Sequence, residues 1–202
     1  MEILTHIFFK KKTTFQMEIV KLTEFDIRRI ILPGNYGYCS EYHYEIKRSE
    51  SESGLKFELN LTKRSEPYRK IWKEDESTLN IYRNMICDGM SLSAMIDNQP
   101  AGILIAEKRE WNNSVWIEKL HVADEFKHRG VGSLMMKEFV RLAGMQNYRI
   151  IYLETQNTNY PAIQLYKKNG FEITGIDLKL YDGKENLNEV AIFMTKNLTQ
   201  NG

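Results

Sequence analysis

The sequence has few of the residues and patterns that would place it in a specialised class. Its two cysteines, Cys39 and Cys87, form no CxxC or Cys/His pattern, so neither a disulfide scaffold nor a structural zinc site is expected. The longest apolar runs, such as 103–106 and 150–153, are much shorter than the roughly 20 residues that cross a bilayer. With 28 basic and 27 acidic residues the net charge is +1, which gives no overall field for a polyanion. We therefore expect a soluble protein with no metal, no nucleic-acid partner and no membrane partner.

What the sequence does have is enough apolar surface for a core. Hydrophobic residues make up 42% of the 202 positions and aromatic residues 11%, which argues against disorder. This length favours one domain, expected over residues 17–202. A second Met-Glu-Ile begins at Met17, so residues 1–16 are predicted to be an extension that adds nothing to the fold. Three lysines follow the apolar run 3–9, which reverses the order of a secretory signal and predicts a cytoplasmic protein.

The first half of the chain predicts strands, helices and one long loop. Residues 34–54 contain three glycines and a polar run, and we expect them to form a loop. Four apolar residues over 55–61 alternate with polar ones, as in a half-buried strand. The other elements expected in this half are a strand at 19–22, a helix from Thr23 to Pro33, a helix at 78–88, and a hairpin of strands 91–97 and 102–109 that turns at Asn98-Gln99-Pro100.

The second half is more regular. The elements expected there are strands at 115–122, 149–154, 171–181 and 189–195, with helices near 132–143 and 161–168. An order in which strands alternate with helices predicts an α/β layer.

One segment between an expected strand and an expected helix has a chemical signature, Lys127-His128-Arg129-Gly130-Val131-Gly132. Its glycines would let the backbone approach a ligand, and the amides that begin a helix present donors and a positive dipole end to a phosphate. A dinucleotide fingerprint does not fit, because Met135 occupies the third glycine position, and no Walker pattern follows. A tight turn without a ligand is the alternative.

Three segments in order resemble the GCN5-related N-acetyltransferase (GNAT) superfamily. They are the strand Trp116–Val122, the loop above, and Asn159–Phe171 with its tyrosine. Both glycines of that family's pyrophosphate signature match, whereas Lys127 stands where Arg or Gln is usual. The resemblance covers about residues 70–196.

Within that superfamily the sequence is similar to the streptothricin acetyltransferases. The matching stretches are Glu66-Pro67-Tyr68, Trp111-Asn112, Ile117-Glu118, Leu153-Glu154-Thr155-Gln156 with Asn159 and Ala162, Asp177 with Leu180-Tyr181, and Asn188–Phe193. Residues 34–64 match poorly, and part of an acceptor pocket could lie there.

The resemblance implies an α/β fold of the GNAT acyl-CoA N-acyltransferase type, with helices on a twisted mixed sheet. Its central strands, 115–122 and 149–154, would splay apart to admit the pantetheine arm of acetyl-coenzyme A, the cosubstrate. The residues implied to bind the coenzyme are Leu120, His121, Val122, Lys127, His128, Arg129, Gly130, Val131, Gly132, Ser133, Asn159, Ala162 and Tyr166.

Two residues carry the catalytic expectations. Tyr166 corresponds to the family's tyrosine near the thioester sulfur and would donate a proton to the departing thiolate, since a tyrosine stays protonated at neutral pH. Its alternative is packing beside Leu165 and Phe171. Glu118, on the strand face of Trp116, Leu120 and Val122, would act as a base, with a structural salt bridge as its alternative. A bulge, common at this strand in the family, would change that face.

Acceptor binding is expected from Trp111, Glu154, Asp177 and Tyr181, although aromatic residues near strand ends also occur in cores and rims. His121 could be a second base or a strand histidine with a satisfied hydrogen bond. Asn159 could also cap a helix.

The resemblance implies transfer of an acetyl group to a primary amine, with streptothricin as the leading acceptor and antibiotic resistance as the effect. Other open acceptors are a protein or peptide amine, a polyamine or another metabolite. A non-catalytic acetyl-coenzyme A-binding module is the alternative of a different class. The protein would be a monomer or a homodimer.

Overall fold

The computed structural model describes residues 3–9, 15–22, 36–182 and 189–198, and the chain divides into two compact units. The first unit comprises residues 1–36, 72–153 and 196–202, and the second comprises residues 37–71 and 154–195. The single domain expected over residues 17–202 stays a prediction. The helix expected from Thr23 to Pro33 lies outside the described residues.

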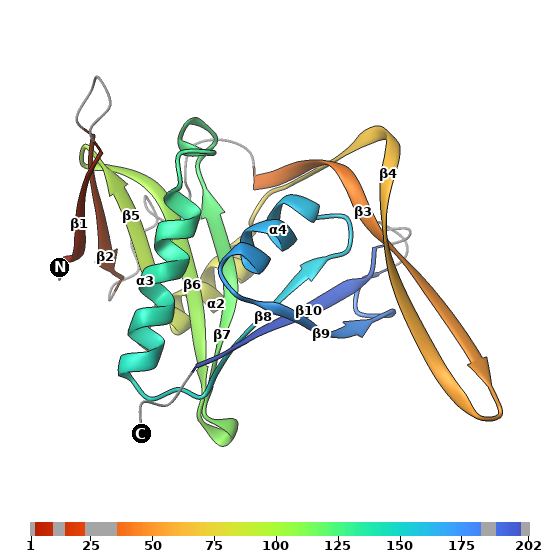
Figure 1. The fold of residues 1–202 in the computed structure, drawn as a ribbon. Coiled ribbons are helices and arrows are strands. Elements are labelled where there is room, and N and C mark those ends of the chain that lie inside the picture. Colours follow the sequence, from red (N-terminus) through yellow and green to blue (C-terminus); the bar gives the residue numbers. More distant parts are fainter. Residues whose placement is uncertain (1–2, 10–14, 23–35, 183–188, 199–202) are drawn as a thin grey trace. The chain divides into compact units, whose positions relative to one another are not determined.

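The first unit is built on a twisted sheet (Figure 1). Its strands follow the order β1 (Ile3–Phe9), β2 (Phe15–Lys21), β5 (Leu92–Ile96), β6 (Gln99–Arg109), β7 (Ser114–Val122) and β8 (Ile150–Gln156), of which residues 150–153 belong to this unit. Neighbours are antiparallel except β7 and β8, which are parallel. Part of the N-terminal extension thus forms β1. That the fold does not need the extension stays a prediction.

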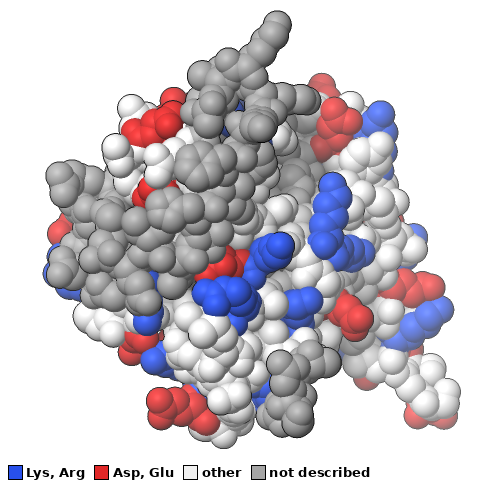
Figure 2. All heavy atoms as spheres, turned by 60° about the vertical axis from the view of Figure 1, so that its left-hand side comes forward, with Lys and Arg blue, Asp and Glu red and all other residues white. Residues whose placement is uncertain are grey.

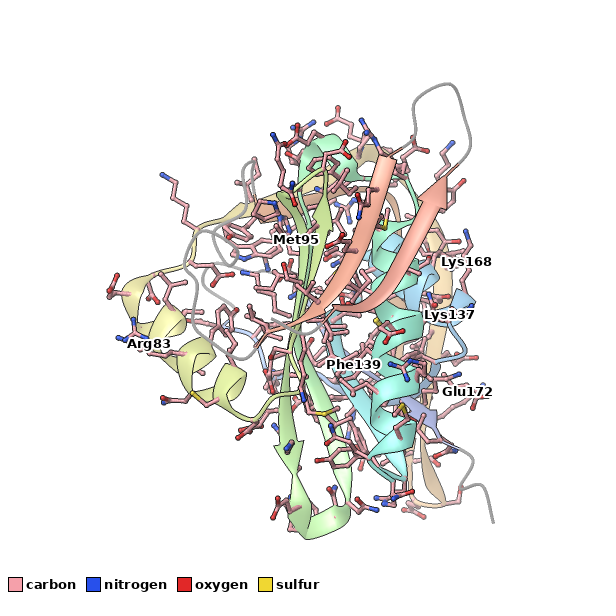
Figure 3. All side chains as sticks on the ribbon, turned by 90° about the vertical axis from the view of Figure 1, so that its left-hand side faces the viewer. Arg83, Met95, Lys137, Phe139, Lys168 and Glu172 are labelled. Atoms are coloured by element: carbon pink, nitrogen blue, oxygen red, sulfur yellow. The ribbon has the colours of Figure 1, made fainter. Side chains whose placement is uncertain are left out.

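Two helices cover opposite faces of this sheet. Helix α2 (Glu76–Cys87) lies on one side of β5 and β6, and α3 (Val131–Met145) lies on the other (Figure 3). In that view Phe139 points from α3 toward the strands, whereas Arg83 points from α2 away from them. The run 103–106 is fully buried because both faces of β6 are covered, which explains why successive residues there are apolar.

Local signals in the sequence set the ends of these helices. The Asp75 carboxylate accepts a hydrogen bond from the Thr78 amide at 2.8 Å and caps α2, and this bond is the main reason that the pKa of Asp75 falls to about 2. On α3, buried residues at helical spacing, among them Met135, Phe139 and Leu142, form the face that packs on the sheet.

The hairpin expected in this unit forms with a shifted turn. Asp97 and Asn98 both have positive φ, +48° and +65°, as a two-residue turn between β5 and β6 requires. Pro100 therefore lies inside β6 instead of in the turn. It lies next to an irregularity in the pairing between Ala94 and Met95, where a proline can be accommodated without a ladder hydrogen bond.

The second unit contains a long two-stranded sheet, β3 (Tyr36–Ser51) with β4 (Gly54–Trp72), which is visible as the extended hairpin in Figure 1. The loop predicted over residues 34–54 is therefore wrong for residues 36–51. Glycine and serine content indicated a loop, whereas alternate tyrosines and polar residues of this stretch form a strand that pairs with β4, the next strand along the chain. The half-buried strand predicted over 55–61 exists, but Leu55, Phe57 and Leu61 are 51%, 37% and 46% exposed.

The hairpin depends on a close backbone approach at Gly37. A Cβ atom there would lie 2.1 Å from the Lys70 carbonyl oxygen, which belongs to the opposite strand and cannot move aside like a side chain. We expect Gly37→Ala to lower the free energy of unfolding by about 1–3 kcal/mol, as overpacking does. Urea titration would measure this, with Gly54→Ala as the control because nothing lies within 4 Å of a Cβ at Gly54. Equal stability of the two variants would contradict the clash.

The rest of the second unit packs around Asn157. Its side chain donates to the Tyr44 carbonyl at 2.9 Å and accepts from the Val190 amide at 2.9 Å, so it joins β3 to the segment before β10. The elements of this part are α4 (Tyr160–Lys168), β9 (Glu172–Asp177) and β10 (Ala191–Asn197), of which β9 and β10 pair antiparallel. Because β3 and α4 also share the Tyr44–Lys167 hydrogen bond at 2.8 Å, the hairpin is held firmly at its base.

Candidate acetyl-transfer site

The predicted site residues fall into two groups, one in each unit. In the first unit, the Lys127–Gly132 segment follows the short helix η2 (Asp124–Phe126) and begins α3. Gly130 has a φ of +85° in the cap position, a left-handed conformation that favours glycine. His128, Arg129, Gly130 and Ser133 are exposed. The first amides of α3 have no acceptor within their own helix, so this end can bind an anion.

Lys127 is the half-buried cation of this loop. Its Nζ lies 2.5 Å from the Asp124 Oδ1, three residues earlier. Arg129 lies with its guanidinium carbon 5.6 Å from the centre of the Phe126 ring. Two cations and a helix start therefore gather at one exposed turn, as a diphosphate would require.

The central strands part after a short pairing. Parallel pairing joins Ser114–Ile117 of β7 to Ile150–Leu153 of β8, and the paired stretch ends there although β7 continues to Val122. This agrees with the splayed strands that the sequence predicts.

A bulge lies in β7 at Glu118. On β6, Ile105 pairs with Lys119 and Ala106 pairs with Ile117, so Glu118 is an extra residue. The prediction that Glu118 shares one alternating face with Leu120 and Val122 therefore fails. Glu118 and Lys119 are consecutive, yet both interact with Tyr82 of α2. The pKa of Tyr82 is raised by burial and then by the charges of Glu74 and Glu118. The Lys119 Nζ lies 5.0 Å from the centre of the Tyr82 ring. Leu120 and Val122 are half-buried.

Glu118 itself is partly accessible, with 26% of its side chain exposed, and its Oε1 lies 3.6 Å from Arg109 Nη2. Arg109 also stacks over Trp116, 4.2 Å from the ring centre, and Trp116 lies parallel to Tyr152 at 5.5 Å. The salt-bridge alternative for Glu118 is therefore present in the structure, which does not prevent its use as a base. Trp111 is 85% exposed in the turn η1 (Glu110–Asn112).

A buried ion pair beside the bulge was missed by the sequence analysis. Lys119 Nζ lies 2.5 Å from Glu74 Oε1, with only 7% and 9% of the two side chains exposed. The ammonium also lies 4.0 Å from the ring centre of Tyr36 and near Tyr82. Burial lowers the pKa of Lys119, while Glu74 opposes this shift. The chain separation of 45 residues leaves no local signal of this pair.

His121 lies next to this pair and is buried. Its ring centre is 4.7 Å from that of Tyr36, and among the described residues its Nε2 has no hydrogen-bond partner. Burial, followed by the charges of Lys119 and Lys127, lowers its pKa to about 4. His121 is therefore neutral at physiological pH, and the predicted satisfied hydrogen bond is not found at Nε2.

In the second unit, Tyr166 lies on α4 and is 7% exposed. Its ring packs 6.1 Å from Phe171, as the packing alternative expects. Burial, with a smaller effect of Glu154, raises its pKa far above the ordinary value, so the hydroxyl keeps its proton. Asn159 caps the same helix by accepting from the Ala162 amide at 3.4 Å, which confirms its capping interpretation.

Glu154 and Tyr181, two predicted acceptor residues, are brought together. The Tyr181 hydroxyl donates to Glu154 Oε1, and burial raises the pKa of that carboxyl although the hydrogen bond lowers it. Asp177 is half-buried at the end of β9, where its carboxylate accepts from the Lys179 amide at 2.7 Å. Asp177 thus shapes a turn, and no contact in the structure joins it to Glu154 or Tyr181.

Ranges 3–9, 15–22, 36–182 and 189–198 hold no cluster of three His, Cys, Asp or Glu suited to a metal, and no helix in them is long and apolar enough to span a membrane. Figure 2 shows side chains of both charge signs on one face.

The chain is similar to known acetyltransferases over much of its length. The sequence profile of the Acetyltransferase (GNAT) family matches residues 58–171. A streptothricin acetyltransferase of Escherichia coli is 32% identical over 138 residues, which are 68% of this chain and 74% of that protein. A streptothricin acetyltransferase of Streptomyces lavendulae is 31% identical over 99 residues, which are 49% of this chain and about half, 52%, of that protein.

Two solved structures share the fold. A crystal structure of nourseothricin acetyltransferase superposes with a TM-score of 0.73 at 23% identity, covering 91% of this chain and 99% of that one. A Bacillus anthracis protein described as a candidate streptothricin acetyltransferase, solved with acetyl coenzyme A, gives 0.69 at 26% identity with the same coverage. The mixed α/β fold predicted from the sequence is confirmed.

Proposed function

Because this chain belongs to the acetyltransferase (GNAT) family, we propose that it transfers the acetyl group of acetyl-coenzyme A to a primary amine of a streptothricin-type antibiotic. The proposed acceptor is inferred from one observation, the similarity to streptothricin acetyltransferases, which reaches 32% identity over 68% of the chain in one case. Acetylation would remove a positive charge from the antibiotic and weaken its binding to an anionic target, which would confer resistance. A cytoplasmic location and a monomeric or homodimeric state stay predictions.

The loop that begins α3 fits the coenzyme's diphosphate. The amides that begin α3, the left-handed Gly130 and the cations Lys127 and Arg129 would hold that group, with Gly132 allowing close approach. In the proposed assignment Leu120, His121, Val122, Asn159 and Ala162 contact the rest of the coenzyme. Acetyl-coenzyme A supplies an activated acyl group as a thioester.

The proton transfers are assigned to two side chains. The neutral acceptor amine attacks the acyl carbon, the carbon–sulfur bond breaks, and the sulfur leaves with a proton from the Tyr166 hydroxyl. The amine nitrogen loses a proton, for which Glu118 is the proposed acceptor, directly or through water. Trp111, Glu154, Asp177 and Tyr181 are proposed to bind the antibiotic, with Glu154 and Tyr181 acting as one unit.

Glu118 gives a pH-dependent test. Replacing it by Gln removes the base without changing the shape of the side chain, so we expect the acidic limb of the kcat/KM profile to change and the rate near neutral pH to fall about tenfold or more. Initial rates from pH 5.5 to 9 would measure this. Glu107→Gln, which removes the other carboxylate paired with Arg109, is the matched control. A Glu118→Gln profile that overlays the wild type would remove the base assignment.

The proposed function is tested by thiol release from acetyl-coenzyme A with purified protein. Streptothricin is compared with aminoglycosides, spermidine and lysine-containing peptides, and mass spectrometry identifies each product. We expect efficient release with streptothricin and one added acetyl group. Release with another amine alone would keep the enzyme class and exclude the resistance role. Coenzyme binding without release for any amine would favour a non-catalytic module.

A further inference from the structure

A cavity of about 410 Å³ lies in the second unit, against the β3–β4 hairpin. The hairpin contributes both polar and apolar lining, including His43, Ile46 and Arg64. The opposite wall consists of residues 157 and 158 after β8 and residues 189 and 190 before β10.

Two residues of this lining each carry a buried polar atom that lacks a hydrogen-bond partner. These atoms are His43 Nδ1 and Arg64 Nε, which have no partner among the described residues. The His43 ring hydrogen-bonds to the backbone of Thr62, which places the ring proton on the other nitrogen and leaves Nδ1 as an acceptor. Burial and then the Arg64 charge lower the pKa of His43, so this neutral form persists at physiological pH. Arg64 Nε carries a hydrogen and is a donor.

Of the two carboxylates in the lining, Glu189 is already satisfied by groups around it. Glu189 accepts from Lys70 Nζ at 2.5 Å and from the Tyr68 hydroxyl at 3.0 Å, and the hydroxyls of Tyr38 and Thr158 lie 3.4 Å away. Only 1% of its side chain is exposed. Glu189 is therefore not available to bind a cation from the cavity.

The charges of the lining disfavour ionic ligands, and its two unpartnered atoms match a ligand with one acceptor and one donor. An anion is disfavoured because Glu45 also lines the cavity and neutral His43 offers no proton at Nδ1. A cation is disfavoured by the Arg64 guanidinium, which is held 5.2 Å from the ring centre of Tyr68. An uncharged group with a carbonyl oxygen and an N–H would satisfy both unpaired atoms, since the oxygen can accept from Arg64 and the N–H can donate to His43.

We propose that this cavity binds an uncharged carboxamide or urea group of the acceptor, remote from the amine that is acetylated, through Arg64 Nε and His43 Nδ1. The assignment to the acceptor rests on the proposed function. It is supported by a chain of contacts within the second unit. Lys70 joins Glu189 at the cavity to the ring of Tyr181, 5.6 Å away, and Tyr181 donates to Glu154, whose charge reaches Tyr166.

The binding chemistry is tested without catalysis by titrating N-methylurea into the full chain while imidazole signals are followed by NMR. The His43 signal is assigned by its loss in His43→Gln. We expect a saturable shift of this signal with N-methylurea, no such shift with acetate or methylammonium, and loss of the response in Arg64→Gln. Lys63→Gln, which removes an exposed neighbouring charge, should retain the response. An unmoved His43 signal, or a response to acetate instead, would overturn the proposal.

The link to the acceptor is tested by kinetics with streptothricin and spermidine. For Arg64→Gln we expect the KM for streptothricin to rise about tenfold, as loss of one buried hydrogen bond predicts, with kcat within twofold. The KM for spermidine, which has no amide, should not change, and Lys63→Gln should resemble the wild type. If N-methylurea binds but the KM for streptothricin is unmoved, the cavity does not hold the acceptor. If N-methylurea binds and streptothricin is not acetylated, the proposed acceptor fails while the cavity's chemistry stands.

Discussion

Replacing Tyr166 by Phe is expected to lower kcat for acetyl transfer at least about tenfold and to leave the Kd for acetyl-coenzyme A unchanged. The hydroxyl is buried and its pKa is raised by that burial, so it stays protonated and can donate a hydrogen bond, and then its proton, to the sulfur as the carbon–sulfur bond breaks. The Phe ring keeps the packing against Phe171, which lies 6.1 Å away. Thiol-release rates and calorimetric titration of the coenzyme would measure the two quantities.

Tyr160→Phe is the matched control, because Tyr160 begins the same helix and packs its ring 5.4 Å from Tyr42. This control should keep the wild-type kcat, and both variants should melt within a few degrees of the wild type. A Tyr166→Phe enzyme with unchanged kcat would leave Tyr166 with a packing role alone.

Replacing Lys119 by Met is expected to lower the free energy of unfolding by about 3–5 kcal/mol, because Glu74 would keep a buried charge without its partner. Met fills a similar volume, so the loss comes from electrostatics more than from packing. Urea denaturation would measure the change in unfolding free energy, and the wild-type m-value should be retained.

A double-mutant cycle compares Lys119→Met, Glu74→Leu and the variant that carries both substitutions. Removing both charges together should recover most of the stability, since two apolar side chains can pack where the ion pair was. If instead the two substitutions cost as much together as the sum of the single changes, Lys119 and Glu74 are not coupled. Lys137→Met, which replaces an exposed lysine on α3, should change stability by less than about 0.5 kcal/mol.

Elements with strong local signals could be predicted from the sequence. Helix α3 was expected at 132–143 and occurs at 131–145, and α4 was expected at 161–168 and occurs at 160–168. Their apolar spacing and capping residues act within a few positions of the chain. The phosphate-type loop before α3 was also predictable, since its glycines and cations are contiguous.

Features that depend on distant partners could not be predicted. The strand at 36–51 has a composition that resembles a loop, and it is held by the hydrogen bond from Asn157 to the Tyr44 carbonyl, 113 positions apart. The Lys119–Glu74 pair joins residues 45 positions apart. The atoms of His43 and Arg64 that lack partners could not be identified from the sequence, because their burial depends on how the hairpin packs near the loop after β8. The sequence therefore predicted the loop and helix α3 better than it predicted the β3–β4 hairpin.

Because β7 contains an extra residue, the number of residues in this strand matters to the site as well as the identity of their side chains. Ile117 and Lys119 oppose consecutive residues of β6, so a chain shortened by Glu118 alone would keep the same register on both sides and a regular ladder. The first unit could then retain its sheet while its backbone lost the extra residue that forms the bulge. Deleting Glu118 would therefore remove the bulge while the pairing of β7 with β6 is kept, and no substitution at this position can do that.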